Sequence, residues 1–428
     1  MKKILIISYF FPPSNITGGY RVFSWAKYLN NFGVYPIIVT RRWDENSEKG
    51  IIYKKFEGYE VYYLPYKENL RDKIAKNSHS ILIKIFGKLL TLFEIFFQNF
   101  FTRAIPYNNL YYKSISILEK DSEIKLIITS AKPFILFKFG YDLQKKFNMP
   151  WIADYRDDWS TSQWYNLKGN KDLYTTNKLL KYIESNREKK WLSKATYFTT
   201  ISNYYTKIIG EFIKKPGFTV MNGYDDEEFK KHSKETYYDE FTITYNGSLY
   251  FSQEIEPFLE GLKEVINYFK GKIEIRIYFP GLSDKKQKIR IKSLLKGFEI
   301  NYIITDRMIK DKIIKIQKKS HLLLMISHKG IKGVTSSKIF EYLGINKPII
   351  LFPSDDDVLE KIILSTNSGY IWNSQDEIVN GLKKIISEYI INNNMILLEQ
   401  NKDKEFYSRK SQTKELADVI AKAIKVYN

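Results

Sequence analysis

The sequence predicts an α/β protein made of two doubly wound domains, each built around a parallel sheet. The first observation is length: 428 residues exceed the size at which one core usually keeps growing, so two domains of roughly 200 residues are expected. The second is a series of short apolar runs that are continuous rather than alternating, which is typical of strands buried on both faces. The third is their spacing, because helix-length segments separate most of them.

The runs also indicate where one domain ends and the next begins. The pattern pauses at VMNGYDDEEF (220–229) and a polar stretch through Asp239, then restarts at Phe241. We therefore expect a first domain over 1–218, a linker over 219–240 and a second domain over 241–428, with a last helix that can pack back on the first domain. The first-half runs are KILIIS (3–8), YPIIVT (35–40), VYYL (61–64), KLIITS (125–130), WIADY (151–155) and YFTTIS (197–202). The second-half runs are TITYNG (242–247), IEIRIYF (273–279), IIT (303–305), LLLMIS (322–327), PIILF (348–352) and GYIW (369–372).

The first strand is joined to a helix by an unusual connection. Residues 9–29 read YFFPPSNITGGYRVFSWAKYL, and helical spacing of Val22, Trp25, Ala26 and Leu29 predicts a helix from Arg21 onward. Two prolines and the Gly18-Gly19 pair fill the gap. Because glycine lets another group come close to the backbone, we expect something to lie against this pair.

Composition excludes several chemistries. The chain has no cysteine, which excludes disulfides, thiolate metal sites and cysteine nucleophiles and is compatible with a reducing compartment. The start MKKILIISYFFPP has an apolar run that is short for a signal peptide and ordinary for a first strand. The sequence contains no GxGxxG, Walker loop, HExxH or GxSxG motif, and its four histidines lack ligand spacing (His79, His232, His321 and His328).

The chain is strongly basic, with a net charge of +20, and much of the surplus falls in Lys263–Ser320. A basic face attracts polyanions such as nucleic acid, anionic lipid or phosphorylated small molecules, and it can equally be a solvated face.

Residues 81–101, ILIKIFGKLLTLFEIFFQNFF, interrupt the α/β rhythm with a segment as long as a membrane span. Charges at the centre of a span are costly, and the polar residues trace one narrow helical stripe (Lys84, Lys88, Thr91, Glu94 and Gln98). We therefore expect an amphipathic insertion over about residues 80–102, which either packs in the core or lies on a membrane surface.

Residues Asp355-Asp356-Asp357 follow the strand PIILF and could hold a metal ion. Ser354 before them is a good N-cap, and negative charge in a first helical turn complements the macrodipole. Helix capping is the favoured interpretation, and no metal site is expected.

Residues 330–352, GIKGVTSSKIFEYLGINKPIILF, are the most informative stretch. A loop bearing hydroxyls opens a helix, predicted over Lys338–Leu343 and ending near Gly344. Free N–H groups, hydroxyls and one lysine at a helix start suit an anion such as a diphosphate, and Glu341 could reach a diol such as a ribose. The alternative is a well-capped helix with a surface glutamate.

A second cluster follows the run WIADY, where open α/β sheets place ligands. Asp154, Arg156 and Asp157 are the candidate catalytic residues, with Asp158 next to them. A carboxylate there could orient an acceptor hydroxyl, and the arginine could pair with phosphate. The alternative is an ion-paired loop that fixes the following helix.

Across nearly the whole chain these motifs resemble retaining glycosyltransferases of family 4, which have the GT-B fold of two Rossmann-like domains facing a central cleft. PP...GGYR...YL resembles the family's glycine loop, and residues 330–352 resemble its nucleotide-sugar segment. PWIADYRDDW (150–159) is similar to a segment of a subgroup that acts in bacterial surface polysaccharide synthesis. TTISNYY, VMNGYDDEEF and TYNGSLY follow in the expected order.

The resemblance implies donor-binding roles at matching positions. Gly18 and Gly19 would approach the donor's phosphate or sugar, and Gly247 and Ser248 would border the diphosphate. The remaining implied donor residues are Ser336, Ser337 and Lys338 on the diphosphate, Glu341 on the ribose and Arg307 near the base. The sequence departs from the family pattern in three respects: Gly333 replaces a glutamate, Phe137 stands about where the subgroup has histidine, and Tyr250 and Gln253 stand where a basic pair is common.

The resemblance implies transfer of a sugar from a nucleotide-sugar donor, most often a UDP-sugar, to a lipid-linked or surface-polysaccharide acceptor, with retention and without metal or other cofactor. It also implies a cytoplasmic, peripheral protein on the anionic inner face of the cell membrane, with no nucleic-acid partner. Two alternatives stay open: a nucleotide-sugar epimerase on the same fold, and a catalytically silent basic protein that binds nucleic acid or anionic lipid.

Overall fold

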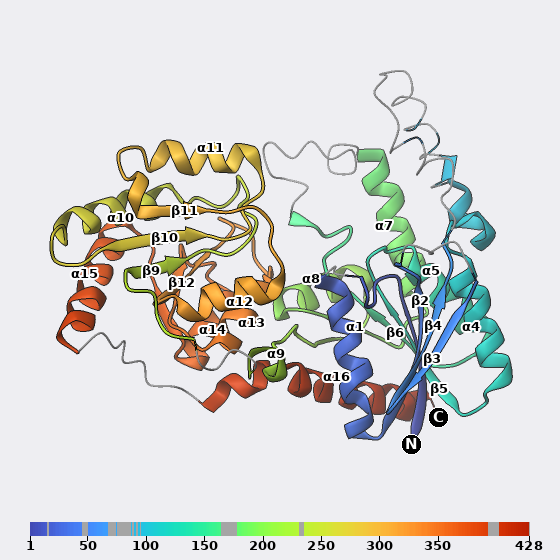
Figure 1. The fold of residues 1–428 in the computed structure, drawn as a ribbon. Helices are drawn as coiled ribbons and strands as arrows, with labels where there is room; N and C mark the ends of the chain where they lie inside the picture. The colour runs from blue at the N-terminus through green and yellow to red at the C-terminus, as the bar shows by residue number, and fades with distance from the viewer. Residues whose placement is uncertain are drawn as a thin grey trace. The chain divides into compact units, whose positions relative to one another are not determined.

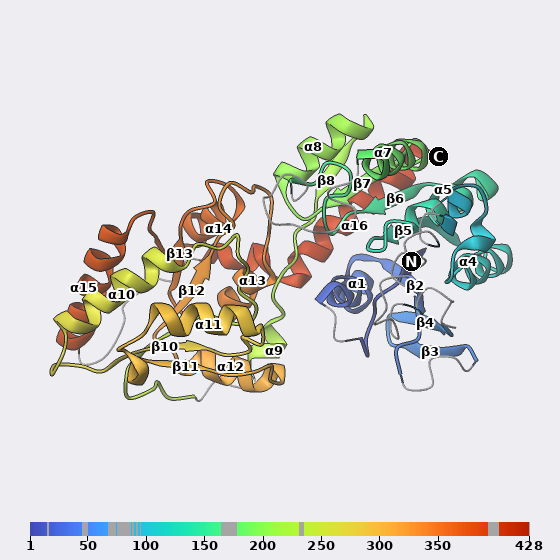
Figure 2. The same cartoon turned by 90° about the horizontal axis from the view of Figure 1, so that it is seen from above.

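A computed structural model describes residues 1–14, 17–44, 50–66, 74, 87, 90, 93–94, 96–163, 178–230, 235–392 and 402–427. The chain forms two compact units (Figures 1 and 2). The first unit comprises Met1–Met221 with Gln412–Asn428, and the second comprises Asn222–Ser411. The predicted linker 219–240 is therefore divided between the units, and its second part contributes α9 (Asp226–Lys230).

The first unit is built on an eight-stranded sheet with the order β3-β4-β2-β1-β5-β6-β7-β8. All neighbours are parallel except β3 and β4. Every predicted strand of this half is present. The strands are β1 (Lys2–Ser8), β2 (Val34–Arg41), β3 (Ile52–Phe56), β4 (Tyr59–Leu64), β5 (Ile124–Ser130), β6 (Trp151–Asp154), β7 (Tyr197–Thr200) and β8 (Gly217–Thr219).

The sequence analysis missed β3 and β8 for physical reasons. β3 is an edge strand whose sequence IYKKF is largely exposed, so it has no apolar run, and β8 has only three residues. Both lie at sheet edges, where burial does not demand a continuous apolar pattern.

Helices cover both faces of this sheet, and the last helix of the chain is one of them. Ile4 and Ile6 of β1 share a core cluster with Trp25 of α1 and with Leu416 and Ile420 of α16. The C-terminal segment therefore completes the core of the first unit (Figure 1). The helices are α1 (Thr17–Tyr28), α4 (Asn109–Lys120), α5 (Leu136–Phe147), α7 (Lys178–Leu192), α8 (Asn203–Ile213) and α16 (Arg409–Tyr427), with 3-10 turns η1 (Leu29–Phe32) and η2 (Thr102–Ala104).

The second unit is built on a six-stranded parallel sheet with the order β11-β10-β9-β12-β13-β14. The strand order reverses between β9 and β12, which makes their carboxyl ends the topological switch point where open α/β sheets bind ligands. All six strands were predicted: β9 (Phe241–Thr244), β10 (Ile275–Phe279), β11 (Tyr302–Ile304), β12 (Leu322–Ile326), β13 (Ile349–Phe352) and β14 (Gly369–Ile371).

Paired helices α10 and α15 cover one face of the second sheet, where Phe258 and Leu262 share a core cluster with Leu382 and Ile386. The helices of this unit, besides α9, are α10 (Glu256–Tyr268), α11 (Lys285–Leu294), α12 (Lys310–Lys319), α13 (Ser337–Ile345), α14 (Val358–Thr366) and α15 (Gln375–Ile391), with 3-10 turns η4 (Glu299–Asn301) and η5 (Lys402–Tyr407). The predicted α/β class with two Rossmann-like parallel-sheet domains is confirmed.

Much of the predicted amphipathic insertion lies outside the described residues. Its described phenylalanines, Phe93, Phe96, Phe97, Phe100 and Phe101, are each between 44% and 64% exposed, so these side chains are not core residues of the first unit. Among the residues described here, no helix is long and apolar enough to cross a bilayer.

Candidate functional site

The predicted anion site lies in the second unit, at the start of α13. Ser336 precedes the helix with extended backbone, and its hydroxyl accepts a hydrogen bond from the Lys338 N–H at 3.3 Å, so it is the N-cap. The helix ends at Ile345, with Asn346 in the left-handed conformation, so the predicted end near Gly344 is confirmed. Gly344 lies in the last turn of the helix, where a Cβ would lie 2.3 Å from the Phe229 ring, so glycine permits this close packing.

Lys338 points to the carboxyl end of β9. Its Nζ donates to Tyr245 Oη at 2.8 Å and to the Ser248 carbonyl at 3.0 Å, and it lies 4.1 Å from the Tyr245 ring centroid. Gly247 has a φ of 78°, in the left-handed region that favours glycine, and an added Cβ would be in ordinary van der Waals contact with Lys338 Cε at 3.7 Å. Burial lowers the pKa of Lys338 to about 7, although Glu341 nearby acts to raise it. The structure thus brings together four predicted donor residues, Gly247, Ser248, Ser336 and Lys338.

Glu341 follows one turn later on α13. Its Oε1 accepts from Asn246 Nδ2 at 3.0 Å and from Gln317 Nε2 at 2.6 Å, and burial raises the pKa of the carboxyl. The partners Asn246 and Gln317 were missed by the sequence analysis, although Asn246 sits beside the predicted Gly247 in the run TITYNG.

Three buried polar atoms at this end of the sheet have no hydrogen-bond partner among the described residues. They are Asn246 Oδ1 after β9, Ser327 Oγ after β12 and Thr335 Oγ1 before α13. The three residues are at most 8% exposed. Because buried polar groups in proteins are almost always hydrogen-bonded, these atoms call for further partners, which a polar ligand or ordered water would supply.

His328 also belongs to this region. Its Nδ1 lies 2.8 Å from Ser252 Oγ, and burial together with the charge of Lys338 lowers its pKa to about 4. The ring is therefore neutral at physiological pH and adds no charge to that of Lys338.

Two other predicted donor-binding residues, Ser337 and Arg307, have exposed side chains. Ser337 is the exposed first residue of α13. Arg307 is exposed after β11, where its N–H donates to Ser283 Oγ at 3.0 Å, and β10 separates that strand from β9.

Residues Asp355-Asp356-Asp357 lie at the start of a helix, so the favoured interpretation, helix capping, is confirmed. The side chain that caps the helix is that of Asp355 and not that of Ser354. The Asp355 carboxylate accepts from the N–H groups of Asp357 (3.3 Å), Leu359 (2.9 Å) and Glu360 (3.0 Å) at the start of α14. Asp357 accepts from the Gly333 N–H at 2.8 Å and so fixes the loop before α13. Within the described chain, no group of three or more His, Asp or Glu is placed to hold a metal ion.

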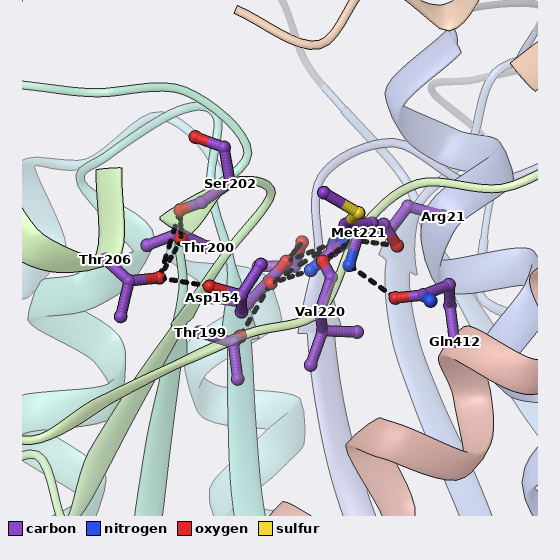
Figure 3. A network of polar contacts seen from close by, with 11 residues as sticks. Arg21, Asp154, Thr199, Thr200, Ser202, Thr206, Val220, Met221 and Gln412 are labelled. Carbon is purple, nitrogen blue, oxygen red and sulfur yellow. Dashed lines mark hydrogen bonds and ion pairs between the residues drawn. The ribbon is translucent and has the colours of Figure 1, made fainter. Parts of the chain in front are cut away.

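In the first unit, Asp154 is fully buried at the end of β6 in a polar network (Figure 3). Its carboxylate accepts from Arg21 Nη2 at 2.7 Å, and it also accepts from Ser130 Oγ and Thr199 Oγ1 at 2.7 and 2.8 Å. Arg21 Nη1 donates to the carbonyls of Val220 (2.8 Å) and Met221 (3.1 Å). The geometry gives Asp154 a structural role, and its predicted catalytic role stays a prediction.

Gln412 extends this network to the returning end of the chain. Its Oε1 accepts from the Met221 N–H at 2.7 Å (Figure 3). The network therefore fixes the last residue before the chain leaves the first unit and the first residue after it returns.

The Gly18-Gly19 pair lies in the first turn of α1, not in the connection as expected, because the helix begins at Thr17. A Cβ on Gly18 would lie 1.7 Å from Arg156 Cζ, and one on Gly19 would lie 3.3 Å from the Phe11 backbone. Groups of the first unit itself therefore account for the close approach that the glycines permit.

Arg156 and Asp157, the other two catalytic candidates, lie side by side in the loop after β6. The guanidinium lies beside Gly18, 5.9 Å from the Phe10 ring centroid, and burial lowers its pKa. Asp157 pairs with Lys132 at 3.2 Å, and both side chains are about half exposed.

The fold class is that of the GT-B glycosyltransferases, because each unit is a Rossmann-like domain and known structures align over the full chain. A UDP-forming α,α-trehalose-phosphate synthase from Burkholderia xenovorans shares 9% identity, with 99% of each chain covered and a TM-score of 0.62. Sucrose-phosphate synthase from Thermosynechococcus elongatus shares 12% identity over 100% of this chain and 95% of its own, with a TM-score of 0.57. An E. coli trehalose-6-phosphate structure bound with UDP-2-fluoro glucose shares 12% identity over 99% and 97%, with a TM-score of 0.58. No protein-family model and no curated protein sequence matches the chain.

Proposed function

We propose that the protein is a nucleotide-sugar glycosyltransferase whose second unit binds the donor. One observation carries this proposal: the start of α13, the amine of Lys338 and three unpartnered buried polar atoms meet at the switch point of a Rossmann-like sheet. A diphosphate supplies what these groups lack, because it accepts hydrogen bonds from the helix N–H groups, from Lys338 and from hydroxyls.

Each residue then has a role in the transfer. Lys338 and the first N–H groups of α13 stabilise the negative charge that develops on the departing diphosphate. Gly247 leaves the backbone beside the phosphates free of a side chain, and Glu341, fixed by Asn246 and Gln317, binds the ribose diol. Retention of the anomeric configuration is part of the proposal, and so are the roles of Arg156 and Asp157 on the acceptor side.

The fold relatives support a uridine diphosphate as the leaving group, since one is UDP-forming and another was bound to UDP-2-fluoro glucose. The names of these relatives include a sugar phosphate. A sugar phosphate is therefore the acceptor class to test against the lipid-linked or polysaccharide acceptor proposed here. The exposed phenylalanines of 93–101 favour the lipid-linked class, because clustered apolar side chains on a surface favour contact with lipid chains. The location proposed is the inner face of the cell membrane.

The test is a thermal-shift panel of nucleotide sugars followed by product analysis with three acceptor arms: none, a sugar phosphate and a lipid-linked glycan. The proposal predicts that one donor raises the midpoint and that its sugar appears on an acceptor. Conversion of the donor without any acceptor would select the epimerase instead. Salt-sensitive binding to polyanions, with no shift from any nucleotide sugar, would select the silent basic protein.

The membrane part of the proposal has its own test. Co-sedimentation with vesicles containing anionic lipid should fall in a Phe96→Ser/Phe100→Ser variant and persist in Tyr268→Ser, which changes an exposed aromatic residue of the second unit. Equal binding by both variants would remove the phenylalanine surface from the proposal.

A further inference from the structure

A group of aromatic rings surrounds Arg41 at the carboxyl end of β2 in the first unit. The Arg41 Cζ atom lies 3.7 Å from the ring centroid of Tyr66 and 4.1 Å from that of Trp43. The Tyr9 ring centroid is 5.2 Å away. Tyr66 follows β4 and Tyr9 follows β1, the strands on either side of β2. The group therefore lies at the edge of the sheet where open α/β proteins bind ligands.

The guanidinium of Arg41 finds few acceptors for its five N–H donors. Nη1 donates to the Tyr9 hydroxyl, and the buried Nε has no partner. Within the described part of the chain, no carboxylate pairs with Arg41. Arg21 of the same unit differs, because it is bonded to the Asp154 carboxylate and to two backbone carbonyls. Ring contacts offset part of the cost of burying the Arg41 charge, but they leave most of its N–H donors without an acceptor.

A second guanidinium lies at the other end of the same aromatic group. The Phe10 ring stacks on the Trp43 ring, with centroids 5.2 Å apart and planes 21° apart. Arg156 Cζ is 5.9 Å from the Phe10 centroid, and Arg156 has no carboxylate partner among the residues that the structure describes. All four side chains are partly exposed. A strip of surface therefore runs from Arg41 across Trp43 and Phe10 to Arg156, with a cation at each end.

We propose that this strip binds the acceptor substrate through a phosphoryl group held by Arg41. The planar guanidinium matches phosphate oxygens with paired N–H groups, and contact with aromatic rings keeps it oriented for that bond. The rings of Trp43 and Phe10 then contact the C–H groups of the remaining part of the acceptor. The assignment to the acceptor rests on the proposed function, in which the second unit holds the donor.

Two classes of acceptor carry the required group, a sugar phosphate and a lipid-linked diphosphate. Either one supplies the negative charge that Arg41 lacks, whereas a neutral sugar does not. The strip leads from Arg41 to the loop after β6, which carries the predicted catalytic residues Arg156 and Asp157. A phosphate at Arg41 therefore directs the rest of the acceptor toward that loop.

Titration calorimetry on the full chain tests the phosphate site without reference to transfer. The probes are glucose 6-phosphate and geranyl diphosphate, each compared with its uncharged parent, glucose or geraniol. At least one phosphorylated probe should bind the wild type more tightly than its parent does, and its affinity should fall about 10- to 100-fold in Arg41→Gln. Arg42→Gln is the matched control and should bind as the wild type does, because Arg42 pairs with Asp44 at 2.7 Å.

A second variant covers the case in which Arg41→Gln does not fold. Arg41→Lys retains the charge and loses the paired N–H groups, so its affinity for the same probe should fall about tenfold. The probe that binds also distinguishes the two sources of phosphate: glucose 6-phosphate represents a sugar-phosphate acceptor, and geranyl diphosphate represents a lipid-linked one.

Three results would overturn the proposal. The first is that neither phosphorylated probe binds the wild type more tightly than its parent, and the second is equal affinity in the folded Arg41 variant and the wild type. The third is a loss of affinity in Lys338→Ala with none in the Arg41 variant, which would place the phosphate in the donor site.

A kinetic arm separates this proposal from the proposed function. Where transfer is detected, Arg41→Gln should raise the KM for the phosphorylated acceptor about tenfold and leave the KM for the nucleotide sugar unchanged. The reverse pattern would contradict a site for the acceptor. A wild type that transfers no sugar would contradict the proposed function, while the calorimetry still decides whether Arg41 binds phosphate.

Discussion

Lys338 lies at the N-terminus of α13, and its amine is buried among hydrogen-bond partners that carry no charge. Its two oxygen partners, the Tyr245 phenol and the Ser248 carbonyl, are neutral, and burial lowers its pKa to about 7. A diphosphate offers full negative charge in place of these partners, so binding it should draw a proton onto the amine.

This exchange predicts a pH dependence of UDP binding. Between pH 7 and 9, where phosphate oxygens are already ionised, affinity should fall with rising pH by up to about tenfold per unit, because the free protein must first protonate Lys338. Lys338→Ala should lose this component and bind roughly 10- to 100-fold more weakly, the worth of a charge-assisted hydrogen bond. Titration calorimetry would measure both effects, with Lys292→Ala, an exposed residue of α11, as control. Equal affinities of the wild type and the two variants would remove Lys338 from the site.

Substitution of Asp154 distinguishes a structural role of its carboxylate from a catalytic one. Asp154→Asn leaves the Arg21 guanidinium buried without its counter-charge, so the free energy of unfolding should fall by about 3–5 kcal/mol. Asp157→Asn breaks a half-exposed pair with Lys132 and should cost about 0–1 kcal/mol. Denaturant unfolding gives both values. A stable Asp154→Asn protein that has lost turnover would instead support the predicted catalytic role.

At the scale of elements, two adjacent glycines of α1 allow close packing against two different groups. Gly18 faces the flexible end of Arg156, whereas Gly19 faces the rigid backbone of Phe11. Gly18→Ala should therefore displace Arg156 with little loss of stability, and Gly19→Ala should lower the melting temperature without moving Arg156. A crystal structure and a thermal scan of each variant would separate the two effects. Arg156 in an unchanged position in Gly18→Ala would contradict the packing described here.

The elements also indicate what could be predicted from sequence. Continuous apolar runs identified every buried strand, because burial on both faces of a sheet demands them, whereas edge strands β3 and β8 carry no such demand. The Ser336-to-Lys338 helix start was predictable because capping is local. The bonds of Glu341 to Asn246 and of Arg21 to Asp154 join residues 95 and 133 positions apart, and no local pattern encodes such pairs.

At the scale of the molecule, the chain returns to complete its own first unit. Leu416, Ile420 and Ala423 of α16 are fully buried in the core that they share with β1 and α1. Deleting 412–428 should therefore lower or abolish the unfolding transition of the first unit and leave that of the second unit in place. Calorimetry would resolve the two transitions. The single substitution Leu416→Ala should destabilise the first unit less than the deletion does, lowering its free energy of unfolding by about 2–5 kcal/mol. Two unchanged transitions would contradict this division of the chain.

A crystal structure of the protein with UDP would test the donor site most directly. The account predicts diphosphate oxygens within hydrogen-bonding distance, about 3 Å, of Lys338 Nζ and of the first N–H groups of α13, with Lys338 turned from Tyr245 toward the phosphate. It also predicts partners for the free oxygens of Ser327 and Thr335. A diphosphate bound elsewhere, or Lys338 still bonded to Tyr245 and Ser248 in the complex, would contradict it.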